Sequence, residues 1–298
     1  VILGDFVTTE DGTGIVHTAP AYGADDYRIG KKYGIGILNL VDREGKFIKG
    51  LGEFSERFVK NYKDHKDYID VNVDIAVSLK DNKAFRIEKY EHNYPHCWRT
   101  DKPILYYPLD AWFIKTTAIK DRMVELNKTI NWKPKSTGEG RFGNWLENMV
   151  DWNLSRSRYW GTPLPIWRTE DGTEEICIGS IEELKLAMKK AEDVLKIRQT
   201  VNPENLDLHK PDVDDIILSS PQGKPMKRVA DLVDVWFDSG AMPYAQWHYP
   251  FENKEVFENN FPADFICEGV DQTRGWFYTL HTLAALLFDS VAFKNVIA

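Results

Sequence analysis

His17 and Asp26 form the first group in the sequence whose residue types suit chemistry. His17 ends an apolar stretch, and Asp26 follows at the start of a predicted helix. A histidine beside a carboxylate at a helix start can position water or anchor an ammonium group. The alternative is a structural histidine at a strand end and an aspartate that caps the helix.

A second group is the segment 268–272 (Glu-Gly-Val-Asp-Gln), which follows a predicted strand at 264–267 and precedes a predicted helix at 274–288. In open α/β sheets, ligands bind at the carboxyl ends of the strands. Two carboxylates and an amide there suit ribose hydroxyls and an ammonium group. The alternative is a polar loop in which Asp271 caps the helix.

Two tryptophans flank this segment in the predicted elements. Trp236 lies in a strand predicted at 233–237, and Trp276 lies in the helix predicted at 274–288. Large aromatic side chains are usually core, so the pair indicates an apolar pocket only in combination with the polar loop.

Other clusters are weaker. His92, His96 and Cys97 are close together, but Pro95 breaks any helix that would align the histidines, and no Cys-x-x-Cys supplies further metal ligands. The segment 156–160 mixes arginine with aromatic residues, which suits either an RNA end or mutual stacking.

Composition divides the chain into four predicted parts: 1–90, 91–162, 163–230 and 231–298. The first is a β-rich α/β unit with a helix from about Ala24, stopped by Gly34, a strand at 71–77 and a polar turn at 80–82. The second is rich in tryptophan and has a helix near 118–127. These patterns indicate α/β structure throughout.

The third part is a small lobe in which Ser180 and Glu183 form a capping box for a helix. The fourth predicts strand, helix and strand, with a final strand at 293–297 and a helix that is almost wholly apolar. That pattern is typical of a parallel sheet covered on its faces, so the predicted fold class is α/β.

The bulk composition restricts partner and compartment. With 43% apolar and 28% charged residues the chain is ordinary globular material, and its net charge of −8 requires any RNA contact to rest on local basic clusters. Three widely spaced cysteines favour a reducing, cytoplasmic compartment. No apolar run reaches the length of a membrane span. The abrupt ends suggest an internal piece of a larger protein.

Five motifs, in order along the chain, resemble those of isoleucyl-tRNA synthetases. They are Gly12–Pro20 (GTGIVHTAP) with Asp25–Tyr27, then Tyr94–Arg99 (YPHCWR), Leu154–Pro163 (LSRSRYWGTP), Asp234–Gly240 (DVWFDSG) and Glu268–Phe277 (EGVDQTRGWF). The resemblance implies a class I aminoacyl-tRNA synthetase, with the second half of a Rossmann-like parallel-sheet catalytic domain and part of an inserted, β-rich α/β editing domain.

The resemblance also implies an activity and its residues. The intact enzyme would activate isoleucine with ATP and Mg²⁺, transfer it to tRNA(Ile) and hydrolyse misattached valine. His17 and Asp26 would act in editing. The aminoacyl-adenylate would contact the loop and the two tryptophans: Glu268, Gly269, Asp271, Gln272, Trp236 and Trp276.

The sequence departs from the family pattern in ways that limit these expectations. The ATP-binding His-x-Gly-His motif, the Lys-Met-Ser-Lys-Ser loop and the threonine-rich half of the editing pocket do not occur in it, so this segment alone is expected to be inactive. Some relatives carry zinc-binding cysteines where this chain has Thr100, 170–172 and 219–220, so no zinc is expected.

Two rival functions remain open. Valyl-tRNA synthetases share the organisation, but they usually place lysine where His17 stands, and their tryptophan motif differs from that around Trp236. A non-catalytic tRNA-binding module is the other alternative, and it would bind tRNA independently of Glu268 and Asp271.

Overall fold

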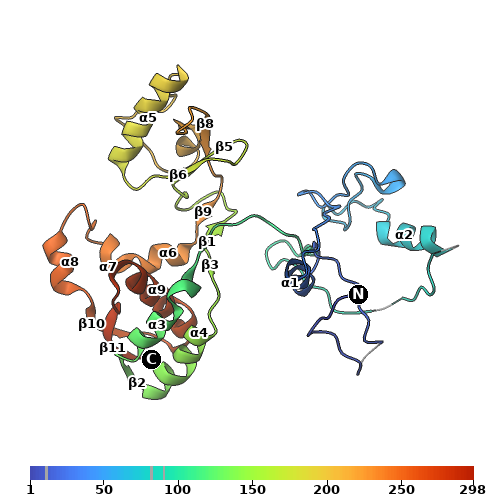
Figure 1. Cartoon of the computed structure of the whole chain (residues 1–298), viewed down its shortest axis with the longest axis horizontal. Coiled ribbons are helices and arrows are strands. Elements are labelled where there is room, and N and C mark those ends of the chain that lie inside the picture. The colour runs from blue at the N-terminus through green and yellow to red at the C-terminus, as the bar shows by residue number, and fades with distance from the viewer. Residues whose placement is uncertain (11–12, 81–82, 90) are drawn as a thin grey trace. The chain divides into compact units, whose positions relative to one another are not determined.

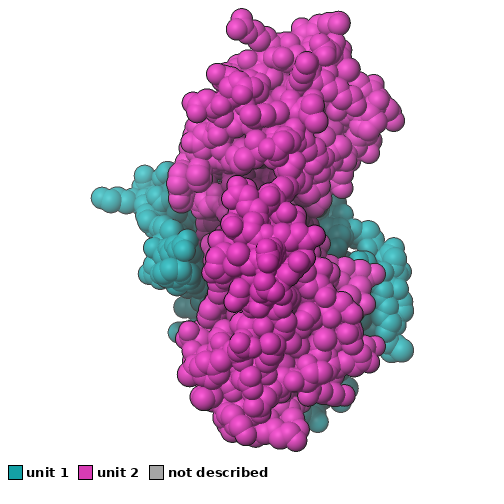
Figure 2. All heavy atoms as spheres, turned by 90° about the vertical axis from the view of Figure 1, so that its left-hand side faces the viewer, with its two compact units in different colours: residues 1–110 teal, residues 111–298 magenta. Residues whose placement is uncertain are grey.

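The computed structural model describes residues 1–10, 13–80, 83–89 and 91–298. They form two compact units, Val1–Asp110 and Ala111–Ala298, coloured teal and magenta in Figure 2. Gly12 of the first motif and Asp81 and Asn82 of the predicted turn lie outside the described residues. The four predicted domain boundaries stay predictions.

The first unit contains α1 (Ala24–Lys32), a 3₁₀ turn (Gly52–Phe54) and α2 (Val71–Lys80). The predicted helix at Ala24 is confirmed, and it ends before Gly34, whose φ of 66° is left-handed. Isolated antiparallel bridges link further segments, namely Val41 with Phe47, Lys46 with Phe58, and His96 with Pro103.

The strand predicted at 71–77 is wrong, because these residues form α2. The Asp70 carboxylate accepts a hydrogen bond from the Asn72 backbone N–H at 2.9 Å, as a residue at a helix start does. Val73 and Val77, four residues apart, are both exposed on this helix. A short alternation of apolar and polar residues is therefore compatible with either element.

The second unit is built around a three-stranded parallel sheet. Its order is β10 (Ala263–Cys267), β11 (Phe293–Ile297) and β2 (Asn131–Lys133), and α9 (Trp276–Phe288) connects the first two strands (Figure 1). The predicted α/β class with a Rossmann-like parallel sheet is confirmed.

Helices α3 (Lys120–Asn127), α4 (Gly143–Glu147) and α9 pack on this sheet and form one core. At its centre the rings of Trp132, Phe277 and Phe293 meet edge to face, with centroids 5.7–6.4 Å apart. The faces of α9 are almost wholly buried, which explains its apolar composition. This core fixes the edge of the sheet to which the candidate ligand loop is attached.

Two short antiparallel pairs lead from this core towards a smaller lobe. β1 (Phe113–Ile114) pairs with β3 (Trp152–Asn153), and β4 (Ser155–Arg156) pairs with β9 (Leu232–Val233). The chain enters the lobe after β4 and returns from it in β9, and because these two strands pair, the entering and returning segments lie side by side.

The lobe is a four-stranded antiparallel sheet with one long helix, α5 (Ile181–Leu195), against it (Figure 1). The predicted capping box is confirmed, because the Ser180 hydroxyl accepts from the Glu183 N–H at 3.1 Å. The Glu183 carboxylate accepts from the Gly179 N–H at 2.7 Å. In sheet order the strands are β6 (Glu175–Cys177), β5 (Ile166–Thr169), β8 (Pro225–Arg228) and β7 (Ile217–Ser219).

Three short helices complete the second unit: α6 (Val235–Gly240), α7 (Met242–Ala245) and α8 (Lys254–Asn260). Within the described ranges, no helix has both the length and the apolar character that crossing a membrane would need.

Candidate functional site

The segment Glu268–Gln272 leaves the parallel sheet at the carboxyl end of β10. The Glu268 backbone N–H still donates to the Ile297 carbonyl of β11, at 3.3 Å. Because the three strands are parallel, their carboxyl ends share this edge, which is where open α/β sheets bind ligands. The structure places the loop at the predicted edge, and the roles of its residues stay predictions.

The loop is a 3₁₀ turn, Val270–Arg274, between two glycines. A Cβ added at Gly269 would lie 2.5 Å from an Asp271 carboxylate oxygen, and one at Gly275 would lie 2.7 Å from the Gln272 side-chain oxygen. Both glycines therefore leave room for the loop's own polar side chains. The carboxylates of Glu268 and Asp271 are exposed at this edge.

The Gln272 side-chain amide already makes hydrogen bonds within the protein. Its Oε1 accepts from the Trp276 backbone N–H at 2.9 Å, and its Nε2 donates to Asp271 at 3.3 Å. Gln272, rather than Asp271, therefore satisfies a backbone donor in the first turn of α9. A ligand that bonds the Gln272 amide must replace these contacts.

Trp236 and Trp276 lie beside the same loop. Trp236 is in the first turn of α6 and is 41% exposed, and its ring edge lies 3.3 Å from the position of a Cβ on Gly275. The Trp276 indole N–H donates to the Ser239 carbonyl at 2.9 Å. The structure thus brings both tryptophans and the loop together along α6 and at the start of α9.

The strand predicted at 233–237 is wrong beyond Val233. Asp234 ends the strand and begins α6, because its carboxylate accepts from the Trp236 backbone N–H at 3.3 Å. The same buried carboxylate accepts from the Trp152 indole at 3.0 Å and from Arg156 at 2.7 Å. Asp234 therefore fixes where the helix bearing Trp236 starts.

Asp238 lies one turn further along α6. Burial raises the pKa of Asp238, and the nearby Asp234 charge acts in the same direction, whereas a hydrogen bond from Thr162 opposes them. The two acidic groups of this motif thus differ in their partners, since Asp234 pairs with Arg156 at 2.7 Å.

Arg141 and Thr273 anchor the candidate ligand loop, which is the segment Glu268–Gln272 and the 3₁₀ turn that continues it to Arg274. The Arg141 Nε–H donates to the Thr273 hydroxyl at 2.9 Å, and that hydroxyl donates to the Val270 carbonyl at 2.7 Å. Thr273 is fully buried, and Arg141 belongs to a π-helical segment, Thr137–Phe142. The loop is therefore tied to a segment 132 residues earlier in the chain.

In the first unit, Asp26 contacts the loop that follows His17. Its carboxylate accepts from the Ala19 backbone N–H at 3.1 Å, and Gly23 lies close against it. His17 is exposed. This geometry brings Asp26 and the segment after His17 together, and leaves the chemistry of the pair a prediction.

Metal ligands are not clustered in the described part of the chain. Across residues 1–10, 13–80, 83–89 and 91–298, no group of three or more His, Cys, Asp or Glu side chains is arranged to hold an ion. In the lobe, Lys224 pairs with Asp171 at 2.7 Å and so links two turns, at 170–173 and 220–224.

Comparison with known proteins identifies the family. A model of the family described as tRNA synthetases class I (I, L, M and V) matches residues 50–298. A protein named Isoleucine--tRNA ligase from Cytophaga hutchinsonii is 63% identical over 100% of this chain, and one of the same name from Bacteroides fragilis is 56% identical. The chain spans 29% and 30% of these relatives' lengths.

A solved structure gives a weaker likeness. It is titled as the ternary complex of an Agrobacterium radiobacter K84 LeuRS with tRNA and LeuAMS, and it covers 50% of this chain and 19% of its own. The identity is 20% and the TM-score is 0.32.

Proposed function

The chain belongs to the class I tRNA synthetases (I, L, M and V), and we propose that it is a segment of an isoleucine–tRNA ligase. The observation that carries the proposal is the 63% identity, over the whole chain, to a protein of that name. The five motifs resembling isoleucyl-tRNA synthetases support the same assignment.

The proposed reaction has two steps. The isoleucine carboxylate attacks the α-phosphorus of ATP and pyrophosphate leaves, which gives isoleucyl-adenylate. A ribose hydroxyl at the end of tRNA(Ile) then attacks the acyl carbon, and AMP leaves. ATP would enter with Mg²⁺ bound to its phosphates.

The ligand loop would hold the adenylate in this scheme. Glu268 and Asp271 offer carboxylates to an ammonium group or ribose hydroxyls, and Gly269 lets a ligand approach the backbone. Gln272 would contribute its amide after releasing Trp276. The rings of Trp236 and Trp276 would lie beside the isoleucine side chain.

The first unit would contribute to proofreading. A single missing methylene gives too little binding energy to reject valine, and isoleucine against valine is the standard case of this limit. Asp26 would bind the ammonium group of misattached valine, and His17 would hold the terminal ribose or the hydrolytic water.

The remaining assignments follow from the proposed activity. The partner is tRNA(Ile), the compartment is the cytoplasm, where tRNA is charged, and no zinc is expected in this segment. In the turns where some relatives carry zinc-binding cysteines, the Asp171–Lys224 pair supplies a cross-link that needs no metal.

The experiment is amino-acid-dependent ATP–pyrophosphate exchange, measured on the full-length protein with isoleucine, valine, leucine and methionine. Exchange strongest with isoleucine is expected. Exchange strongest with valine would instead assign a valyl-tRNA synthetase. No exchange at all, with tRNA binding intact, would favour a non-catalytic tRNA-binding module.

A further inference from the structure

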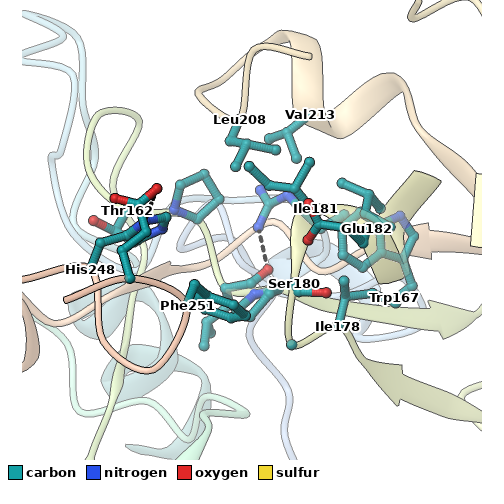
Figure 3. Close-up of a pocket in the computed structure, with 17 residues that line it drawn as sticks. Thr162, Trp167, Ile178, Ser180, Ile181, Glu182, Leu208, Val213, His248 and Phe251 are labelled. Carbon is teal, nitrogen blue, oxygen red and sulfur yellow. Dashed lines mark hydrogen bonds and ion pairs between the residues drawn. The ribbon is translucent and has the colours of Figure 1, made fainter. Parts of the chain in front are cut away.

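A cavity of about 540 Å³ opens between the small lobe and the turn that joins α7 to α8. Figure 3 shows His248 and Phe251 on one side of it and Trp167 and Ile178 opposite. The volume falls within the roughly 300–1,000 Å³ range of small-molecule sites. It lies outside the ligand loop, and none of its lining residues belongs to the proposed synthetic or editing groups.

The walls of the cavity are mainly apolar. They come from the segment that enters the lobe, from its sheet and the turn before α5, from the loop after α5, and from the α7–α8 turn: Pro163, Leu164, Trp167, Ile178, Leu208 and Phe251. Water in such a space finds few polar partners, so an apolar body is favoured there.

The charged groups on the lining favour a cation. Glu182 and Glu252 line the cavity and are both exposed. Glu182 is in the first turn of α5, a position that favours an acidic side chain. The His248 Nδ1 lies 3.4 Å from the Glu252 carboxylate.

Arg228 also lines the cavity, but its guanidinium group already pairs with a carboxylate and donates to backbone carbonyls. Its Nε donates to Asp214 at 2.6 Å, and one terminal nitrogen donates to the carbonyls of Leu164 and Asp231 at 3.1 and 3.0 Å. The side chain is fully buried. Among the described residues, the lining therefore presents the carboxylates of Glu182 and Glu252, whereas the guanidinium of Arg228 is already paired with Asp214.

We propose that this cavity is a binding site for an organic cation with an aromatic or branched apolar body, whose ammonium group pairs with an exposed carboxylate of the lining, Glu182 or Glu252. Because the cavity walls come from both the lobe and the α7–α8 turn, such a ligand would contact the lobe and this turn at the same time. This inference is independent of the proposed ligase activity.

The test is a binding titration of the full-length protein, followed by NMR, with three probes that share one body. They are 2-naphthylmethylamine, 2-naphthylmethanol and 2-naphthoate. We expect the amine to bind about fivefold more tightly than the alcohol, because partly exposed ion pairs add only modestly to affinity. The carboxylate should bind most weakly.

Variants locate the site. The double variant Glu182→Gln and Glu252→Gln should bring the amine to the affinity of the alcohol and leave the alcohol unchanged. Phe251→Ala should weaken both. Glu255→Gln, an exposed carboxylate of the neighbouring α8 that does not line the cavity, is the matched control and should change neither.

Three results would overturn the proposal: naphthoate binding as tightly as the amine, no amine binding at millimolar concentration, or amine affinity unchanged in the double variant. The replaced carboxylates are exposed, so the variants are expected to keep the wild-type melting temperature, which is measured alongside.

Discussion

His281 is a fully buried histidine of α9 whose ring bonds on one side only. Its Nε2 lies 2.9 Å from the Met123 carbonyl, to which it must donate, and its Nδ1 has no hydrogen-bond partner in the described part of the chain. Protonation would place a charge inside the core, so burial lowers the pKa of His281 to about 4.

The stability of the second unit should therefore fall as the pH falls. An unfolded histidine titrates near pH 6.5, so between pH 6.5 and about 4 the unfolded chain binds the extra proton. The stability due to neutral His281 is complete above about pH 6.5, and about 3 kcal/mol of it is lost by pH 4.

Urea unfolding from pH 7.5 to 4.5 measures this effect. His281→Gln keeps a donor for Met123 and cannot titrate, so its stability should vary less with pH. His65→Gln, at an exposed histidine, is the control. Equal pH slopes for wild type and His281→Gln would contradict the assignment.

Asp26 permits a residue-scale test of the proofreading proposal. In the full-length protein, Asp26→Ala should leave isoleucylation unchanged and slow deacylation of valyl-tRNA by about tenfold or more, the effect of losing one charge-assisted hydrogen bond. Asp26→Asn separates charge from structure, since its oxygen can still accept from Ala19.

The matched control for Asp26 is Asp25→Ala. Asp25 lies in the same first turn of α1 but pairs with Arg28 on the surface at 3.1 Å. Deacylation at the wild-type rate in Asp26→Ala would remove this residue from the proposed mechanism.

At the scale of elements, the ligand loop depends on the buried Thr273 hydroxyl, which links the Val270 carbonyl of the loop to the distant Arg141. Thr273→Val removes the acceptor for Arg141 and the hydroxyl that donates to the Val270 carbonyl, at a cost of about 1–2 kcal/mol. If Thr273 positions the loop, the KM for isoleucine in exchange should rise more than kcat falls.

Two variants separate positioning from simple destabilisation. Thr273→Ser keeps the hydroxyl and should restore KM. Thr282→Val removes a comparably buried hydroxyl, which donates to Tyr278 within α9, and should lower stability without changing KM. An unchanged KM in Thr273→Val would leave the residue a purely structural role.

The start of α6 depends on Asp234 in a similar way. Asp234→Asn removes the negative charge that pairs with Arg156 in a buried position, and should cost about 2 kcal/mol. Thermal unfolding measures the loss. Asp231→Asn is the control, because the Asp231 side chain accepts a long hydrogen bond, 3.3 Å, from the exposed Ser157 hydroxyl. Equal stabilities of the two variants would contradict the prediction.

Elements with strong local signals could be predicted from the sequence. The apolar run of α9, the strands on either side of it and the Ser180 cap each have a local physical cause. The segments at 71–77 and 235–237 could not, because short mixed patterns fit a strand or a helix. There a single aspartate at the start, Asp70 or Asp234, accompanies a helix.

At the scale of the whole molecule, the candidate site in the second unit is assembled from distant segments. The loop was predicted because it follows a strand directly. Its supports were missed because Arg141 and Thr273 are 132 residues apart, and Arg156 and Asp234 are 78 apart. Nothing in residue spacing reveals a contact across such distances, whereas family resemblance points to the motifs but not to their pairing.

The segments that enter and leave the lobe are hydrogen-bonded to each other, and this bears on whether the lobe can be removed. The Val233 N–H donates to the Thr162 carbonyl at 2.7 Å, and the Leu164 N–H donates to the Asp231 carbonyl at 3.3 Å. Entry and exit thus form one hydrogen-bonded stem, and the lobe has its own core around Trp167 and Met188.

A protein in which a short glycine-serine linker replaces residues 166–229 should keep the parallel sheet and the Asp234–Arg156 pair, which hydrogen exchange of β10 and β11 can measure. Loss of protection there would show that the lobe is needed for the core to fold. If protection persists, the lobe is an independent insertion carried on the hydrogen-bonded stem. Its size and sequence could then change during evolution without altering the register of the parallel sheet.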